Sequence, residues 1–287
     1  MAERSYDSPP GTLSLFARAG AAMIPGASRL PFVGGGGKDV PDLTLALNDV
    51  AVDRERLASY CRVCEFGISN TLPPTYPHIL AFPLHLALMT DGSFPFPAIG
   101  LVHIENRITQ RRPIPDSETL SLRVWATPVE PHPRGKQFSV RTEASIGGEV
   151  VWEEVSTNLK RGGGSGSRSG KSRERTAEHL PATATWQLPG DLGRRYASVS
   201  GDMNPIHMHP LSARLFGFPS AIAHGMWTKA RCLAALQSRL PDAFTATVSF
   251  RKPILLPATV EFAEAGERFE VRSAEKDTPH LDGTVTT

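Results

Sequence analysis

The chain contains Tyr196-Ala-Ser-Val-Ser-Gly-Asp202-Met-Asn204-Pro-Ile-His207 and, shortly after it, Ile222-Ala-His224-Gly225-Met226. Asp202 and His207 lie five residues apart, and a carboxylate and an imidazole held together can bind one water and move its protons. Gly225 opens an apolar, helix-like run, and a glycine at a helix start offers a bare backbone N–H to a substrate oxygen. These groups are suited to adding or removing water next to a carbonyl.

The same stretch resembles the signature of the (R)-specific enoyl-CoA hydratases, the MaoC-like or hydratase-2 group of hot-dog proteins. In that group the Asp and His of an Asp-x-Asn-Pro-x-His motif are catalytic, so the resemblance implies catalytic roles for Asp202 and His207. From about residue 43 to its end, the chain is similar to the double-hot-dog 3-hydroxyacyl-thioester dehydratases of actinobacteria. The resemblance implies hydration of a 2-enoyl thioester, or dehydration of the (3R)-hydroxyacyl thioester, with no cofactor and no metal.

Composition and charge are ordinary for a globular protein. The 287 residues are 40% hydrophobic and 21% charged, and the net charge of +2 gives no reason to expect nucleic acid or an anionic membrane as a partner. Three cysteines cannot form a disulfide framework, and Cys61-Arg-Val-Cys64 has no second pair of ligands at zinc-site spacing. The apolar run near the N-terminus is too short to span a membrane. We therefore expect no integral membrane segment and a cytoplasmic location.

Composition also divides the chain into four segments. Residues 161–175 contain no apolar side chain and read as part of a flexible linker over 161–180. We expect an N-terminal arm over 1–40, loosely held or forming a short amphipathic helix. The first hot-dog domain, over 41–160, would be non-catalytic, and the second, over 181–287, would carry the active site.

The two halves repeat one order of elements. Strands are expected at 43–47, 101–109, 119–129, 137–146 and 149–159, and then at 184–188, 245–250, 259–263, 268–272 and 281–286. Helices are expected at 53–64 and 80–89, and then at 191–200 and from 224 to about 239. Periodicity alone predicts an α+β protein. The resemblance refines this to a double hot-dog, two antiparallel sheets each wrapped around a long helix.

The first half lacks the catalytic motif. Glu65-Phe-Gly-Ile occupies the region where Asn-Pro-x-His would lie. Aligning the halves by landmarks sets Phe82-Pro83 against His224-Gly225. Because proline has no N–H, this position cannot polarise a carbonyl. The sequence therefore predicts one active site per chain, in the second half.

Supporting roles follow from local chemistry. Asn204 is expected to support the turn, since asparagine side chains satisfy nearby backbone groups, and Gly201 to permit the bend before Asp202. We expect His224 to be structural rather than catalytic. The Gly225 N–H is expected to stabilise the thioester oxygen as charge develops on it.

Substrate-binding residues are predicted in both halves. Phe82 and Leu86 would belong to the wall of an acyl-chain tunnel in the first half. Arg251 and Lys252 are candidates for the phosphates of coenzyme A. Three further basic residues near the motif are candidates for the same role: Arg214, Lys229 and Arg231. An acyl-carrier-protein thioester would use the same chemistry on a different surface.

Two other functions stay open at this point. A hot-dog acyl-CoA thioesterase also needs a carboxylate and a polarising N–H, but it gives no reason for Asn-Pro-x-His. A non-catalytic acyl-CoA-binding subunit of a heteromeric dehydratase would not need Asp202 and His207. The sequence leaves acyl-chain length, the direction of the reaction and the quaternary state open, with a homodimer as the candidate assembly.

Overall fold

The computed structural model describes residues 2–22, 37, 39–162 and 179–287 of the chain. Its strands are β1 (Ala2–Tyr6), β2 (Leu43–Val50), β3 (Leu101–Gln110), β4 (Leu120–Ala126), β5 (Glu130–His132), β6 (Gly135–Ile146), β7 (Glu149–Arg161), β8 (Ala182–Leu188), β9 (Phe244–Phe250), β10 (Ala258–Ala265), β11 (Arg268–Ser273) and β12 (Pro279–Thr286). Its helices are α1 (Thr12–Ala21), α2 (Arg54–Cys64), α3 (Tyr76–Met89), α4 (Leu192–Ser200), α5 (Pro205–Met208), α6 (Pro210–Leu215) and α7 (Gly225–Leu236), with the short 3₁₀ helix η2 (Gln237–Arg239) after α7.

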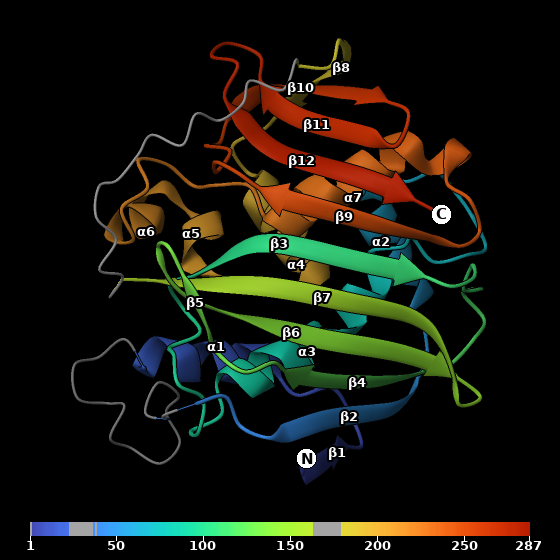
Figure 1. Ribbon diagram of the computed structural model, residues 1–287, viewed down its shortest axis with the longest axis vertical. Helices are drawn as coiled ribbons and strands as arrows, with labels where there is room; N and C mark the ends of the chain where they lie inside the picture. Colours follow the sequence, from blue (N-terminus) through green and yellow to red (C-terminus); the bar gives the residue numbers. More distant parts are fainter. Residues whose placement is uncertain (1, 23–36, 38, 163–178) are drawn as a thin grey trace.

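The strands form one continuous 12-stranded sheet in the order β1-β2-β4-β6-β7-β3-β9-β12-β11-β10-β8, with β5 paired to β6 (Figure 1). From the outside to the centre, β2-β4-β6-β7-β3 of the first half matches β8-β10-β11-β12-β9 of the second. The halves meet where β3 and β9 pair antiparallel, from Glu105 opposite Ser249 to Gln110 opposite Phe244. The repeated order and the continuous sheet confirm the double hot-dog.

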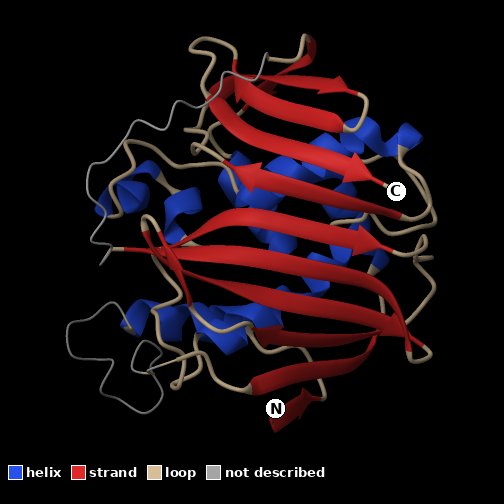
Figure 2. Ribbon diagram, in the orientation of Figure 1, coloured by secondary structure: helices blue, strands red, loops and turns tan. Residues whose placement is uncertain are grey.

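The long helices α3 and α7 lie against the concave face of this sheet (Figure 2). α3 packs on β2, β4 and β6 and is buried along almost its whole length. Inward-facing strand residues alternate with outward-facing ones, as in β4, where Leu120, Leu122 and Val124 are fully buried. Within the described part of the chain, no helix is long and apolar enough to cross a membrane.

The ends of the two halves lie on either side of the expected linker. β7 ends at Arg161 and β8 begins at Ala182, and residues 163–178 lie outside the described part of the chain. At the N-terminus, the expected short helix is α1, and its Phe16 ring packs 6.4 Å from the Phe82 ring on α3. β1 was not expected from the sequence. It pairs parallel to β2 and extends the sheet by one strand.

The boundary of the first long helix differs from expectation. α3 begins at Tyr76, four residues before the predicted start at Leu80. Pro83 therefore lies in the interior of the helix, whereas Gly225 is the first residue of α7. The expected equivalence of Phe82-Pro83 with His224-Gly225 is wrong.

Matching backbone contacts give the correct alignment. Thr71 bridges Pro115 in the first half, as Ile222 bridges Leu255 in the second. The next residue also matches in each half, because the N–H of Leu72 donates to the carbonyl of Ile114 (2.8 Å) and that of Ala223 to Ile254 (2.9 Å). Counting onward from these pairs, Pro73-Pro74 occupies the place of His224-Gly225. A proline without an N–H still stands at the glycine position, but it is Pro74.

Candidate active site

The candidate catalytic segment begins where α4 ends. Gly201 closes that helix in the left-handed conformation (φ 81°), which only glycine adopts at little cost. The Asp202 side chain then accepts a hydrogen bond from the N–H of Asn204 at 3.1 Å. Asn204 in turn caps α5, accepting from the N–H of Ile206 at 3.5 Å, and Pro205 occupies the first helical position. Asn204 and Gly201 therefore have the supporting roles that the sequence predicted.

His207 lies on α5 and is buried. Its Nδ1 lies 2.8 Å from the carbonyl of Ile222, and because a carbonyl can only accept, Nδ1 carries the proton. Nε2 of the neutral ring is then left with a free lone pair. Burial lowers the pKa of His207, although the nearby Asp202 carboxylate partly opposes this shift. The ring is therefore neutral at pH 7 and can act as a base.

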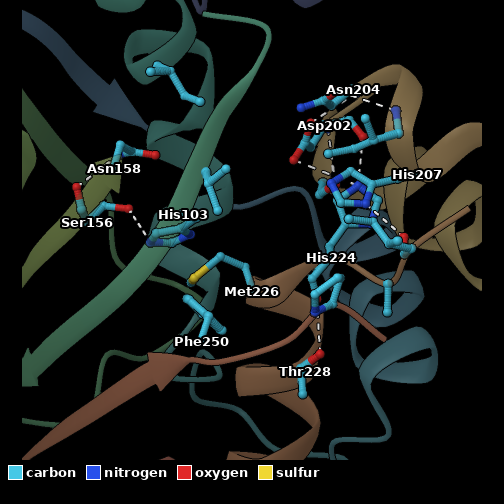
Figure 3. Close-up of a pocket in the computed structure, with 18 of the residues that line it drawn as sticks. His103, Ser156, Asn158, Asp202, Asn204, His207, His224, Met226, Thr228 and Phe250 are labelled. Atoms are coloured by element: carbon cyan, nitrogen blue, oxygen red, sulfur yellow. Dashed lines mark hydrogen bonds and ion pairs between the residues drawn. The ribbon is translucent and has the colours of Figure 1, made fainter. Parts of the chain in front are cut away.

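Asp202 and His207 converge on one point. Together with His224 they form a group in which a carboxylate oxygen and ring nitrogens lie within 4.8 Å of one another. One water making two hydrogen bonds of about 2.8 Å spans such a gap. Figure 3 shows Asp202, Asn204, His207 and His224 gathered on one side of the pocket. The two side chains can therefore hold a single water between them.

The His224 side chain holds Asp202 and His207 in position through one hydrogen bond and one ring contact. Its Nε2 donates to the backbone carbonyl of Asp202 at 3.0 Å, and its ring stacks on the ring of His207 with centroids 3.6 Å apart. Burial, followed by the charge that His207 would carry, lowers the pKa of His224 well below its usual value. The neutral ring fixes the Asp202 backbone and the orientation of His207, in agreement with a structural role.

Gly225 is the first residue of α7, so its N–H has no partner within the helix. Among the described residues, none accepts a hydrogen bond from this N–H. A Cβ added at Gly225 would lie 3.0 Å from the Phe250 ring, so packing as well as chemistry favours glycine. The residue lines the same cavity as Asp202 and His207.

This cavity has a volume of about 240 Å³ and is lined by residues of both halves. It brings together most of the residues predicted from the sequence: Asp202, Asn204, His207, His224, Gly225, Phe82, Leu86, Arg251 and Lys252. Gly201 does not line the cavity itself, and a Cβ added there would contact Thr12 and Phe82. The candidate catalytic pair from the second half therefore shares its cavity with polar and apolar residues of α3 from the first half.

The basic residues predicted to bind coenzyme A phosphates fall into two groups, those at the cavity and those held by contacts within the protein. Arg251 and Lys252 lie at the cavity, and Arg251 forms an exposed ion pair with Asp282 at 2.5 Å. The suggestion that Lys229 meets coenzyme A phosphates is wrong, because Lys229 is fully buried and donates to Asn106 and Ala246. Arg231 lies over the Trp186 ring at 4.2 Å and pairs with Glu65. Neither is free to bind a phosphate.

Sequence reasoning missed one part of the cavity. Six polar residues of the first half line it: His78 and His85 on α3, His103 on β3, and Ser156, Asn158 and Arg161 on β7. A signal for them existed, because Glu154, Ser156 and Asn158 take alternate positions of a predicted strand and so share a face. The periodicity showed a strand but did not show which face lined a cavity.

Two groups of side chains have the donor types that bind metals. In Asp202, His207 and His224 the ring protons are directed to backbone carbonyls, which leaves one lone pair on each ring. In His78, His85 and Glu154, the carboxylate accepts from His78 and from Asn106. Hydrogen bonds within the protein orient the rings of both groups, and Nδ1 of His224 is a buried atom without a partner among the described residues.

Comparison with known proteins agrees with this geometry. The family model described as "MaoC like domain" matches residues 171–284. The chain is 38% identical to 3-hydroxyacyl-thioester dehydratase X of Mycobacterium tuberculosis over 282 residues, 96% of this chain and 98% of that protein. The crystal structure of HtdX from the same organism superposes with a TM-score of 0.75 at 38% identity, covering 84% of this chain and 98% of that one.

A more distant likeness concerns the fold alone. A Mycobacterium tuberculosis protein described as having a double hot-dog fold superposes with a TM-score of 0.53 at 14% identity, covering 87% of this chain and 98% of that one. The near-complete match to dehydratase X and the matching domain extend the similarity beyond the fold. The chain belongs to the MaoC-like family of 3-hydroxyacyl-thioester dehydratases.

Proposed function

We propose that the protein is an (R)-specific 2-enoyl-thioester hydratase and (3R)-hydroxyacyl-thioester dehydratase of fatty-acid metabolism, a hydro-lyase acting on acyl-CoA or acyl-carrier-protein thioesters. The observation that carries this proposal is the convergence of an Asp202 carboxylate oxygen and a His207 ring nitrogen within 4.8 Å, in the same cavity as Gly225. The family relationship supports the reaction class and the configuration at C3. The active site is the single one expected in the second half.

In the hydration direction, Asp202 and His207 hold one water against C3 of the enoyl thioester. The water oxygen bonds to C3 as its proton passes to one of the pair, the C2–C3 π electrons move toward C1, and C2 takes a proton. The thioester oxygen becomes enolate-like, and the Gly225 N–H at the α7 N-terminus stabilises it. Dehydration runs the same steps in reverse, so no atom beyond those of water is gained or lost.

The first test removes the catalytic side chains one at a time. We expect Asp202→Ala and His207→Ala each to lower kcat for enoyl-CoA hydration by about 10²–10⁴, the usual contribution of an acid–base group. His209→Ala is the matched control, because His209 is an exposed cap of α6 just beyond the site. Turnover by either alanine variant at the wild-type rate, measured as loss of enoyl absorbance, would remove that residue from the mechanism.

The same assay separates the alternative functions. A hot-dog thioesterase would release free thiol, whereas hydration consumes the enoyl group without releasing thiol. A non-catalytic subunit would turn over neither crotonyl-CoA nor longer enoyl thioesters as a purified chain. The retained Asp202 and His207 in an accessible cavity favour catalysis by this chain alone.

The quaternary state and location belong to the same proposal. The outer strands β1 and β8 end the sheet, and an open sheet edge promotes association, so we propose a homodimer, which light scattering in solution tests. Three free cysteines, Cys61, Cys64 and Cys232, agree with a reducing cytoplasm.

A further inference from the structure

The cavity has two polar ends with apolar surface between them. One end is the proposed catalytic group. The other, which we call the deep polar wall, consists of His78, His85, His103, Ser156 and Asn158. Figure 3 shows His103, Ser156 and Asn158 across the pocket from Asp202 and His207, with Met226 and Phe250 between them. An acyl chain that extends from the catalytic pair into the first half therefore meets hydrogen-bonding groups.

Strand β7 supplies much of this wall. Trp152, Glu154, Ser156 and Asn158 alternate along it and share its inward face. The first three are at most 4% exposed. Burying polar groups beside an acyl tunnel costs free energy unless each group finds a partner, and an apolar tail offers none. Here Glu154 accepts from Asn106, Ser156 bonds to His103 at 2.8 Å and Asn158 donates to the Ser156 carbonyl at 3.1 Å. Partners within the protein therefore account for the strand positions, and the group left open to a ligand lies on α3.

Within the wall, the orientation of His78 is fixed. Its Nδ1 lies 2.9 Å from the Glu154 carboxylate, which also accepts from Asn106 at 2.6 Å. Burial alone would raise the Glu154 pKa, but the hydrogen bonds that the carboxylate accepts from His78 and Asn106 lower it, so Glu154 is ionised. A carboxylate only accepts hydrogen bonds, so the Nδ1 proton of His78 points to it.

The other nitrogen of His78 is available to a ligand. With the proton on Nδ1, Nε2 of the neutral ring is an acceptor. This Nε2 has no hydrogen-bond partner among the residues that the structure describes, and it is not one of their fully enclosed unpaired atoms. His78 lines the cavity, so its lone pair is open to a donor there.

We propose that the deep polar wall binds a hydroxyl group on the acyl tail of the substrate, with the hydroxyl donating to Nε2 of His78. This inference rests on the proposed function, because it names the class of thioester that the site prefers. A ketone cannot donate to Nε2. At His78 a carboxylate would lie beside the Glu154 anion, and burial lowers the pKa of His85 to about 4 and of His103 to about 3, so these two rings supply no positive charge.

The test measures binding of saturated ligands to the purified full-length chain, so that it does not depend on turnover. Dodecanoyl-CoA is compared by calorimetry with derivatives that carry one hydroxyl at a carbon from C5 to C12. We expect one position to bind about tenfold tighter than the plain chain, because a desolvated acceptor is left unpaired without it. The ketone at the same carbon should lose most of that gain.

Two variants test the assignment to His78. In His78→Leu the hydroxyl preference should disappear. In Glu154→Gln, Asn106 keeps the amide oxygen as its acceptor, so the amide NH₂ faces Nδ1 of His78 and shifts its proton to Nε2. Both a ketone and a hydroxyl oxygen can accept from that N–H, so the ketone should then bind about as tightly as the hydroxyl. Leu80→Val is the matched control, since Leu80 is buried on the same helix but does not line the cavity, and it should keep the hydroxyl preference.

Several outcomes would overturn the inference. The first is equal affinity for all hydroxylated and plain chains in the wild type. The second is a hydroxyl preference that survives His78→Leu. The third is a ketone that binds Glu154→Gln no more tightly than it binds the wild type. If His78→Leu does not fold, the wild-type binding series alone decides. If the protein hydrates plain enoyl-CoA but binds plain and hydroxylated chains with equal affinity, the hydroxyl site is rejected and the proposed function is kept. If the protein binds hydroxylated chains more tightly but hydrates no enoyl thioester, the hydroxyl site is kept and the proposed function is rejected.

Discussion

His207 and His224 are neutral histidines with opposite proton positions, and backbone carbonyls set both. His207 donates from Nδ1 to Ile222, which leaves Nε2 as the base. His224 donates from Nε2 to the carbonyl of Asp202. At the scale of the residue, function therefore depends on which nitrogen meets a carbonyl. A histidine placed one residue earlier or later would not keep that contact.

The lowered pKa of His207 predicts a pH dependence. Its pKa in the folded enzyme lies below the ordinary 6.5 because of burial, so the base is neutral at pH 7. We expect kcat/KM to stay level from pH 7 to about 6.5 and to fall at lower pH, as His207 becomes protonated. The profile of hydration rate between pH 4.5 and 8 measures this.

Asp202→Asn provides the control. The Asp202 carboxylate raises the His207 pKa against the larger effect of burial. Its removal should therefore move the acidic limb to lower pH, while the plateau drops by about 10²–10⁴. A limb that moves to higher pH would contradict the assignment of this pKa to His207.

At the scale of elements, the start of each long helix decides which half can react. α7 begins with Gly225 after an extended His224 (φ −68°, ψ 137°), and its N–H is open to the cavity. The matching position in the first half is Pro74, whose carbonyl accepts from the Trp152 indole at 2.7 Å. The same architectural position is thus a donor in one half and a packing contact in the other.

Gly225→Pro tests the N–H while keeping the helix start, because proline suits the first helical position and the residue before it is already extended. A side chain here meets the Phe250 ring, so both Gly225→Pro and its control Gly225→Ala are made with Phe250→Leu. We expect kcat of the proline variant to fall about 10²–10³ below that of the alanine variant. Equal rates for the two would rule out this N–H as the oxyanion donor.

Helix α3 should set acyl-chain length. Phe82 and Leu86 line the cavity one turn apart, so Phe82→Ala or Leu86→Ala lengthens the space and Leu86→Phe shortens it. We expect the kcat/KM optimum across C4 to C16 enoyl-CoA substrates to move to longer chains in the alanine variants and to shorter chains in Leu86→Phe. An unchanged optimum in folded variants would show that the chain takes another path.

At the scale of the whole molecule, the halves are joined through a buried polar chain as well as through the sheet. Lys229 on α7 donates to the Asn106 side chain on β3 at 2.6 Å and to the Ala246 carbonyl on β9 at 2.9 Å. The Asn106 side chain in turn donates a hydrogen bond to the Glu154 carboxylate on β7. Because the cavity lies between the halves, this chain holds the tunnel wall in place relative to the catalytic pair.

Lys229→Met tests this connection. The change leaves buried carbonyls without a donor, and we expect a loss of about 1–3 kcal/mol of unfolding free energy at pH 7. Burial lowers the Lys229 pKa to about 7 in the folded state, against 10.5 as the ordinary value. At a pH between these two pKa values, Lys229 is protonated in the unfolded chain but not in the folded protein. The unfolding free energy of the wild type therefore rises by up to about 1.4 kcal/mol per pH unit because of this group.

The methionine variant lacks that gain, so the stability difference between the two proteins should widen from pH 7 to pH 10 in urea titrations. Other titrating groups are common to both proteins and cancel in the difference. A difference that stays flat or narrows with pH would show that Lys229 keeps its proton in the folded protein.

The sequence by itself determined the α+β class and the repeated element order, and it predicted the catalytic motif and the turn roles of Gly201 and Asn204. These follow from periodicity and from contacts within a few residues, which local sequence encodes. Only the tertiary structure decided that β1 joins the sheet, that Pro74 rather than Pro83 stands opposite Gly225, that Lys229 is buried, and that His78 faces the cavity. Each of these depends on partners more than thirty residues away, and the burial of a side chain is fixed only when those distant segments pack against it.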